Sequence, residues 1–211
     1  MAGKGCVAVV ADKRLGAGNA LIGDGACRVL ECGDRAVVAM RGLHADVQTL
    51  FEDLDSRLRL RWIEAGGRGT RAWIEPSALA AMVSVMLYAA RLSPEEAHWF
   101  LEPIVAGLSR KGDAYLCAQD SLGAQLVSSK YVVVGTAAHS LHGACEALYE
   151  PDLDPHQLRD LAVRCMSAGL HRDCLSGRTL VVHLITPDGH TKSDHSVTFL
   201  SSTPRSSSSS P

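Results

Sequence analysis

Short apolar runs separated by turn residues open the chain. The first run, Cys6–Ala11, is apolar and β-branched, which is typical of a buried strand. Two further runs, Cys27–Cys32 and Arg35–Met40, are separated by Gly33-Asp34, a pair that favours a tight turn. The pattern predicts a meander of short strands that pair antiparallel.

After Gly42 the apolar residues recur at intervals of three and four. This spacing predicts an amphipathic helix over Leu43–Ile63, with charged residues on its other side. A second helix is predicted over Pro76–Leu92, because proline suits the first turn of a helix. The second helix is so apolar that we expect it to pack on both sides.

The second half of the chain repeats the succession of strands and helices. Two apolar runs, Ile104–Leu108 and Ala114–Gln119, predict a hairpin. The remaining predicted elements are a strand over Lys130–Gly135, helices over Thr136–Tyr149 and Asp154–Leu170, and a strand over Thr179–Ile185. This order predicts an α+β fold, in which two antiparallel sheets stack and carry helices on their outer faces.

Composition narrows the functional class. Of 211 residues, 46% are hydrophobic and 21% charged, which is typical of a globular chain, and the net charge of −2 argues against nucleic acid as a partner. No apolar run reaches membrane-spanning length, so no membrane association is expected. Seven cysteines without CxxC spacing indicate reduced thiols. Residues 201–211 are serine-rich and are expected to form a disordered tail.

Local motifs for metal or thiol chemistry are weak. His139, His142 and Cys145 share helical spacing, but they lack the acidic residue of an HExxH motif. Ordinary packing is the favoured interpretation, and no metal or cofactor is predicted. Cys174 has a histidine and an aspartate close by in sequence, yet catalytic partners normally converge from separate elements.

The strongest signal is a set of seven segments whose order and spacing extend to about Leu200. They are Cys6–Arg14, Gly33–Arg35, Gly42–Gln48, Glu102–Leu108, Tyr131–Thr136, Glu150–Pro155 and Arg172–Gly177. Together they resemble the β-type subunits of the 20S proteasome. The resemblance implies one β-type domain over residues 1–200, with the N-terminal-nucleophile hydrolase fold, a four-layer αββα sandwich. It also implies other proteasome α and β subunits as partners, a role in ubiquitin-dependent protein degradation, and a location in cytoplasm and nucleus.

The resemblance also implies a pocket. Active family members attack the peptide bond with the hydroxyl of an N-terminal threonine, whose own amine can serve as the base. The residues that match the surroundings of this nucleophile are Asp12, Arg28, Gly42, Thr136, Asp173 and Ser176. Active members have lysine in place of Arg28 and serine in place of Thr136. An arginine keeps the charge but cannot release its proton near neutral pH.

The attacking threonine has no match, because the first threonine, Thr49, lies inside a predicted helix. The family's first strand is likewise expected to be missing, and Cys6 is too close to Asp12 to act as a substitute nucleophile. We therefore interpret the chain as a non-catalytic structural subunit with a vestigial pocket and no catalytic residue. The alternative is an active threonine-type endopeptidase subunit whose N-terminal threonine lies upstream of Met1.

Two apolar segments are candidates for contacts with other subunits. One is the part of the second helix around Met82–Leu87, and the other is the cluster Trp99–Leu101. Exposed apolar clusters of this kind usually mark interfaces. The sequence leaves open that either segment belongs to the core.

Overall fold

The computed structural model describes residues 1–67, 73–93 and 98–197. The strands are β1 (Ala2–Gly3), β2 (Cys6–Asp12), β3 (Arg14–Ala17), β4 (Ala20–Asp24), β5 (Val29–Glu31), β6 (Ala36–Gly42), β7 (Leu101–Leu108), β8 (Ala114–Gln119), β9 (Gln125–Ser128), β10 (Thr179–Thr186) and β11 (Gly189–Ser196). The helices are α1 (His44–Glu64), α2 (Pro76–Leu92), α3 (Ala138–Leu148) and α4 (Pro155–Leu170). Within this described part, no helix is long and apolar enough to cross a membrane.

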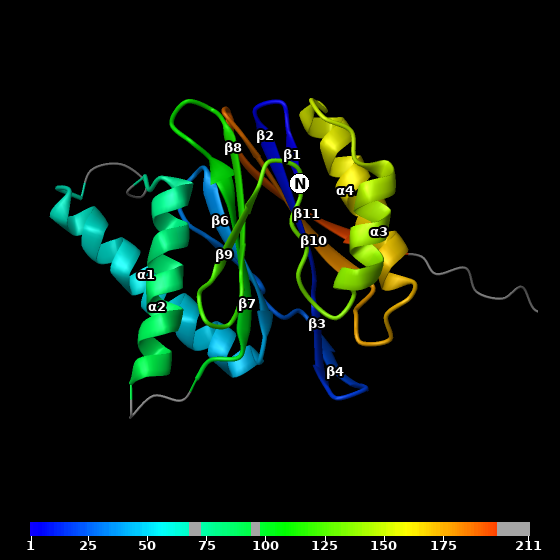
Figure 1. Ribbon diagram of the computed structural model, residues 1–211, viewed down its shortest axis with the longest axis horizontal. Helices are drawn as coiled ribbons and strands as arrows, with labels where there is room; N and C mark the ends of the chain where they lie inside the picture. Colours follow the sequence, from blue (N-terminus) through cyan, green and yellow to red (C-terminus); the bar gives the residue numbers. More distant parts are fainter. Residues whose placement is uncertain (68–72, 94–97, 198–211) are drawn as a thin grey trace, which may run out of the picture.

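Four layers follow one another across the molecule (Figure 1). Helices α1 and α2 cover the five-stranded sheet, whose order is β5-β6-β7-β8-β9, and helices α3 and α4 cover the four-stranded sheet, whose order is β1-β2-β10-β11. All strand pairs are antiparallel. The α+β architecture and the outer helices expected from the sequence are confirmed.

The core between the sheets is apolar and comes from both of them. Val7 of β2 and Ile185 of β10 pack with Val37 of β6 and Leu116 of β8, and all four are fully or almost fully buried. Side chains alternate between the two faces of a strand, so the residues between these positions face the helices instead.

Helix α2 packs on one side only, so the expectation of packing on both sides was wrong. Leu79 and Leu87 are buried against the five-stranded sheet, whereas Val85 and Tyr88 are more than half exposed. Helix α4 begins with a capping box, in which the Asp154 carboxylate accepts the backbone N–H of Gln157 at 2.9 Å.

Two other expectations failed in the central part of the fold. The apolar run Lys130–Gly135 is not a strand. It meets the four-stranded sheet through a hydrogen bond from the backbone N–H of Ala2 to the carbonyl of Lys130, and Val132 packs against the core between the sheets. The strand preceding Cys6 is not missing altogether, because β1 pairs with β2 through Ala2 opposite Val7. Strand β9 was not predicted from the sequence either.

The hairpin of β3 and β4, which the sequence did not predict, is held by Arg14. Its guanidinium is almost buried and donates to the carbonyl oxygens of Gly18, Asn19 and Ala20 within the hairpin. It also donates to the carbonyl of Leu175 at 2.8 Å, in the loop that follows α4. One side chain therefore connects the hairpin to that loop. The expected tail at residues 201–211 lies outside the described residues.

Candidate functional site

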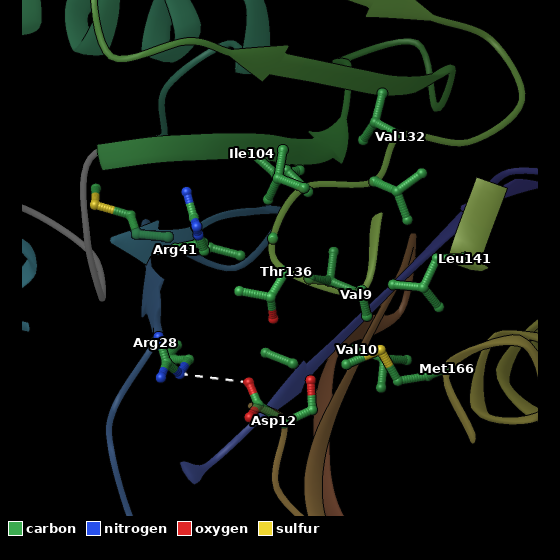
Figure 2. A pocket seen from close by; sticks show the side chains of 18 of the residues that line it. Val9, Val10, Asp12, Arg28, Arg41, Ile104, Val132, Thr136, Leu141 and Met166 are labelled. Carbon is green, nitrogen blue, oxygen red and sulfur yellow. Dashed lines mark ion pairs between the residues drawn. The ribbon is translucent and has the colours of Figure 1, made fainter. Parts of the chain in front are cut away.

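A cavity of about 670 Å³ is lined by β2, β6, segment 132–137, α3, α4 and the loop after α4. Five of the six residues matched to the family pocket line it, and the sixth, Asp173, bonds to two of them. Figure 2 shows Asp12, Arg28 and Thr136 in this cavity, with the apolar side chains of Val10 and Met166 along another part of the wall. The structure thus brings together all the residues proposed from the sequence.

Asp12 and Arg28 form the charged part of the cavity. Asp12 ends β2, and its Oδ1 lies 3.5 Å from Nε of Arg28 (Figure 2). Its other oxygen, Oδ2, accepts the backbone N–H of Gly177 at 3.0 Å. Nη2 of Arg28 donates to the carbonyl of Arg14 at 2.6 Å. Both charged groups are therefore held by each other and by the backbone.

Asp173 forms a second polar centre. Its Oδ2 accepts the hydroxyls of Thr136 and Ser176, each at 2.5 Å, and its Oδ1 accepts the backbone N–H of Leu175 at 2.9 Å. Burial raises the pKa of this carboxyl, but the two hydroxyls, the N–H and the nearby Arg14 outweigh it, and the net pKa lies below the usual value. Both hydroxyl protons are thus directed at one carboxylate, an arrangement that joins segment 132–137 to the loop after α4.

Gly42 has a structural reason to be glycine. Its φ is 149°, a conformation that side chains rarely adopt. A Cβ atom there would overlap the carbonyl oxygen of Phe100 and lie 3.0 Å from Cα of Leu101. The close approach of β6 and β7 therefore accounts for glycine at this position.

The weaker sequence candidates are dispersed. His139 and His142 are exposed on α3, whereas Cys145 is buried, so the three do not share a face directed at one point. Cys174 is exposed. Sequence reasoning missed a different cluster, His183 and His190 with one glutamate, although a histidine inside the apolar run of β10 was a visible signal.

Comparison with known proteins identifies the family. The family model described as proteasome subunit matches residues 1–185. The chain belongs to the proteasome subunit family. The resemblance inferred from the seven segments is thereby confirmed, and the match covers both sheets except β11.

Several proteasome relatives match over most of their length. Proteasome subunit beta type-3 of Picea mariana is 35% identical over 188 residues, which cover 89% of this chain and 88% of the relative. The protein of the same name from Trypanosoma brucei brucei is 39% identical over 189 residues, with the same two coverages. A probable proteasome subunit beta type-3 of Schizosaccharomyces pombe is 35% identical over 188 residues, again with these coverages.

Proposed function

We propose that this chain is a non-catalytic structural subunit in the β ring of the 20S proteasome core particle, built on the N-terminal-nucleophile hydrolase fold. In this role it completes the ring and positions neighbouring active subunits, which degrade ubiquitin-marked proteins in cytoplasm and nucleus. The names of its relatives support the assignment to the β type. The observation that carries the non-catalytic part is the closed bonding of the pocket.

The five polar side chains matched to the family pocket all contact other groups of the chain, although Nε of Arg28 is buried without a hydrogen-bond partner. Asp12 is held by Arg28 and the N–H of Gly177, and the hydroxyls of Thr136 and Ser176 donate to a single carboxylate. Active members have lysine at the position of Arg28, and an arginine side chain does not offer the neutral amine that can take a proton from a nucleophile. The five polar residues thus connect β2, segment 132–137 and the loop after α4.

An exposed apolar stripe on α2 supports assembly with other subunits. Val85, Tyr88 and Leu92 are spaced at i, i+3 and i+7 and are 66%, 53% and 63% exposed. Of the cluster Trp99–Leu101, Phe100 is exposed, whereas Leu101 is buried. Permanent subunits bury large apolar areas against their neighbours, and this stripe is suited to such a contact.

The decisive experiment isolates particles through an affinity tag on this chain. Mass spectrometry is expected to find other α and β proteasome subunits in stoichiometric amounts. A peptide epoxyketone, which reacts with N-terminal threonines, is expected to label neighbouring subunits but not this chain. Arg28→Lys, which introduces the lysine of active members, is expected to leave it unlabelled. Labelling of this chain would establish the active-subunit alternative, and elution as a monomer would refute ring membership.

The α2 stripe is tested separately with two charge substitutions. Tyr88→Glu is expected to reduce incorporation into the particle, because a carboxylate would be buried without a partner. Ser77→Glu adds the same charge at the exposed start of α2, where a helix tolerates acidic residues, and is expected to incorporate normally. Equal incorporation of both variants would exclude the stripe from the interface.

A further inference from the structure

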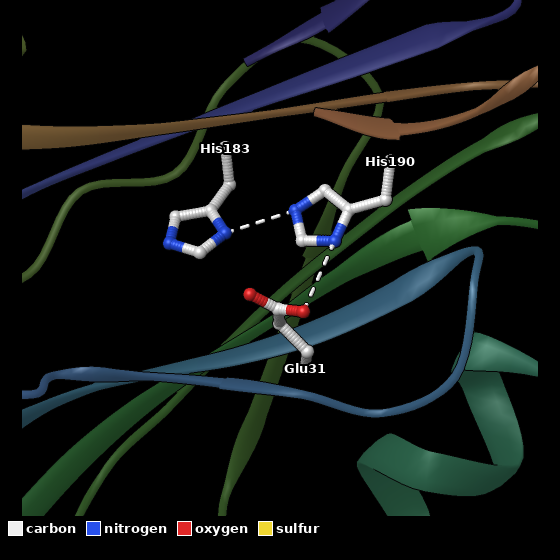
Figure 3. Close-up of side chains that lie close together, drawn as sticks. All are labelled: Glu31, His183 and His190. Carbon is white, nitrogen blue, oxygen red and sulfur yellow. Dashed lines mark hydrogen bonds and ion pairs between the residues drawn. The ribbon is translucent and has the colours of Figure 1, made fainter. Parts of the chain in front are cut away.

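Two histidines and a glutamate from the two sheets meet at one point (Figure 3). His183 lies on β10 and His190 on β11, and Nδ1 of the first is 2.9 Å from Nε2 of the second. Nδ1 of His190 lies 3.7 Å from Oε2 of Glu31, on β5 of the other sheet. The three residues offer ligand atoms that all lie within 4.8 Å of one another.

The strand pleats direct these side chains into the space between the sheets. Val181 and Ile185 belong to the core there, so His183, midway between them, faces the same way. His190 is the partner of Ile185 across the β10–β11 ladder and shares its face. Glu31 follows Val29, another residue of that core, by two positions. The backbone register therefore directs the three side chains into the same space between the sheets.

Burial differs among the three in a way that suits a metal site. His183 is 1% exposed, whereas the Glu31 side chain is 43% exposed, so the cluster has a buried side and a side that faces solvent. Burial disfavours the charged form of both imidazoles and lowers the pKa of each, that of His183 to about 4. The charges that act on them are Glu31, Asp34, Asp194 and Lys192, with carboxylates in the majority.

The spacing is close to that of bound ligands. Two metal–nitrogen bonds of about 2.0–2.1 Å at a tetrahedral angle place their nitrogens about 3.3–3.4 Å apart. The observed 2.9 Å must therefore widen by roughly half an ångström, which a small ring rotation supplies. Two imidazoles and one carboxylate form a donor set that zinc accepts, with a fourth position left for water.

We propose that Glu31, His183 and His190 form a binding site for a divalent transition metal, zinc by its donor set, which joins the edge of the five-stranded sheet to the four-stranded sheet. The site is separate from the family pocket, and the proposal of a metal site does not depend on the proposed function. The metal would connect strands that are far apart in sequence, at a point where each sheet ends in an edge strand.

Titration of the purified full chain with Zn²⁺, followed by calorimetry, tests this proposal. One equivalent is expected to bind, and Glu31→Gln and His190→Gln are each expected to weaken binding roughly tenfold or more. His195→Gln is the matched control, because His195 is an exposed histidine of the same strand on the opposite face. Cys27→Ser removes an exposed thiol that could bind zinc by itself, and neither control is expected to change the affinity.

A thermal measurement guards against variants that fold poorly. Zn²⁺ is expected to raise the unfolding temperature of the unaltered chain and of both controls, but not that of Glu31→Gln, whose side chain is partly exposed and whose fold is least at risk. The proposal is refuted if the unaltered chain binds no zinc, if the two ligand variants bind as tightly as it does, or if His195→Gln or Cys27→Ser abolishes binding.

Discussion

Replacement of Gly42 by alanine tests whether the junction of β6 and β7 requires a glycine. A non-glycine residue at a φ of 149° costs about 1–3 kcal/mol in backbone strain. The added methyl would also overlap the carbonyl oxygen of Phe100 and lie 3.0 Å from Cα of Leu101. Both are backbone atoms, one in the first residue of β7 and the other in the residue before it, so relief requires β6 and β7 to separate, at about 1–3 kcal/mol more. We expect a total loss of about 2–6 kcal/mol.

Alanine variants of two other glycines allow the cost of backbone strain to be measured apart from the cost of steric overlap. Gly18 has a φ of 56° and open space around its Cβ position, so Gly18→Ala carries backbone strain alone, about 1–2 kcal/mol. Gly143 lies in α3, also with open space, and Gly143→Ala is expected to stabilise the chain by about 0.5–1 kcal/mol.

The assay is urea denaturation of the full chain, followed by tryptophan fluorescence, with the free energy of unfolding obtained by linear extrapolation. The three variants are expected in the order Gly143→Ala, Gly18→Ala, Gly42→Ala from most to least stable. If Gly42→Ala lies within about 0.5 kcal/mol of Gly18→Ala, the strands move apart freely and the overlap argument fails.

Three further predictions concern the pocket and the core. Thr136→Val removes one exposed bond to Asp173 and is expected to cost about 0.5–1 kcal/mol in the urea assay; no loss would show that the bond contributes nothing. Because folding lowers the pKa of Asp173, its carboxylate stabilises the chain above pH of about 4 and less below it. The stability difference between the unaltered chain and Asp173→Asn should therefore shrink as the pH falls from about 5 to 3, and a constant difference would contradict this. Leu158→Ala opens a fully buried site beside β2 and should cost about 2–5 kcal/mol by the same denaturation, a smaller loss indicating collapse of the cavity.

Elements fixed by local chemistry were predictable from the sequence. Helix α2 spans Pro76–Leu92 as predicted, because proline at its start and the spacing of apolar residues act within the segment. Strand β8 also has its predicted bounds, Ala114–Gln119. By contrast, Lys130–Gly135 has the composition of a strand but no ladder partner along its length, and composition cannot reveal the lack of a partner.

The candidate site was likewise predictable from the sequence only in part. Family resemblance located all six pocket residues, and the structure brings them together, whereas their vestigial role remains a prediction. The cluster of His183, His190 and Glu31 was missed because its members come from two sheets and, for Glu31, from about 150 residues away. Such proximity depends on sheet stacking, which residue spacing along one element does not encode.

The hydrogen bonds of Arg14 to two separate segments have a consequence for local opening of the fold. Its guanidinium holds the β3–β4 hairpin through three carbonyl oxygens and the loop after α4 through Leu175. Local opening of either segment breaks bonds of the same side chain, so their amide protons should exchange with solvent as one cooperative unit.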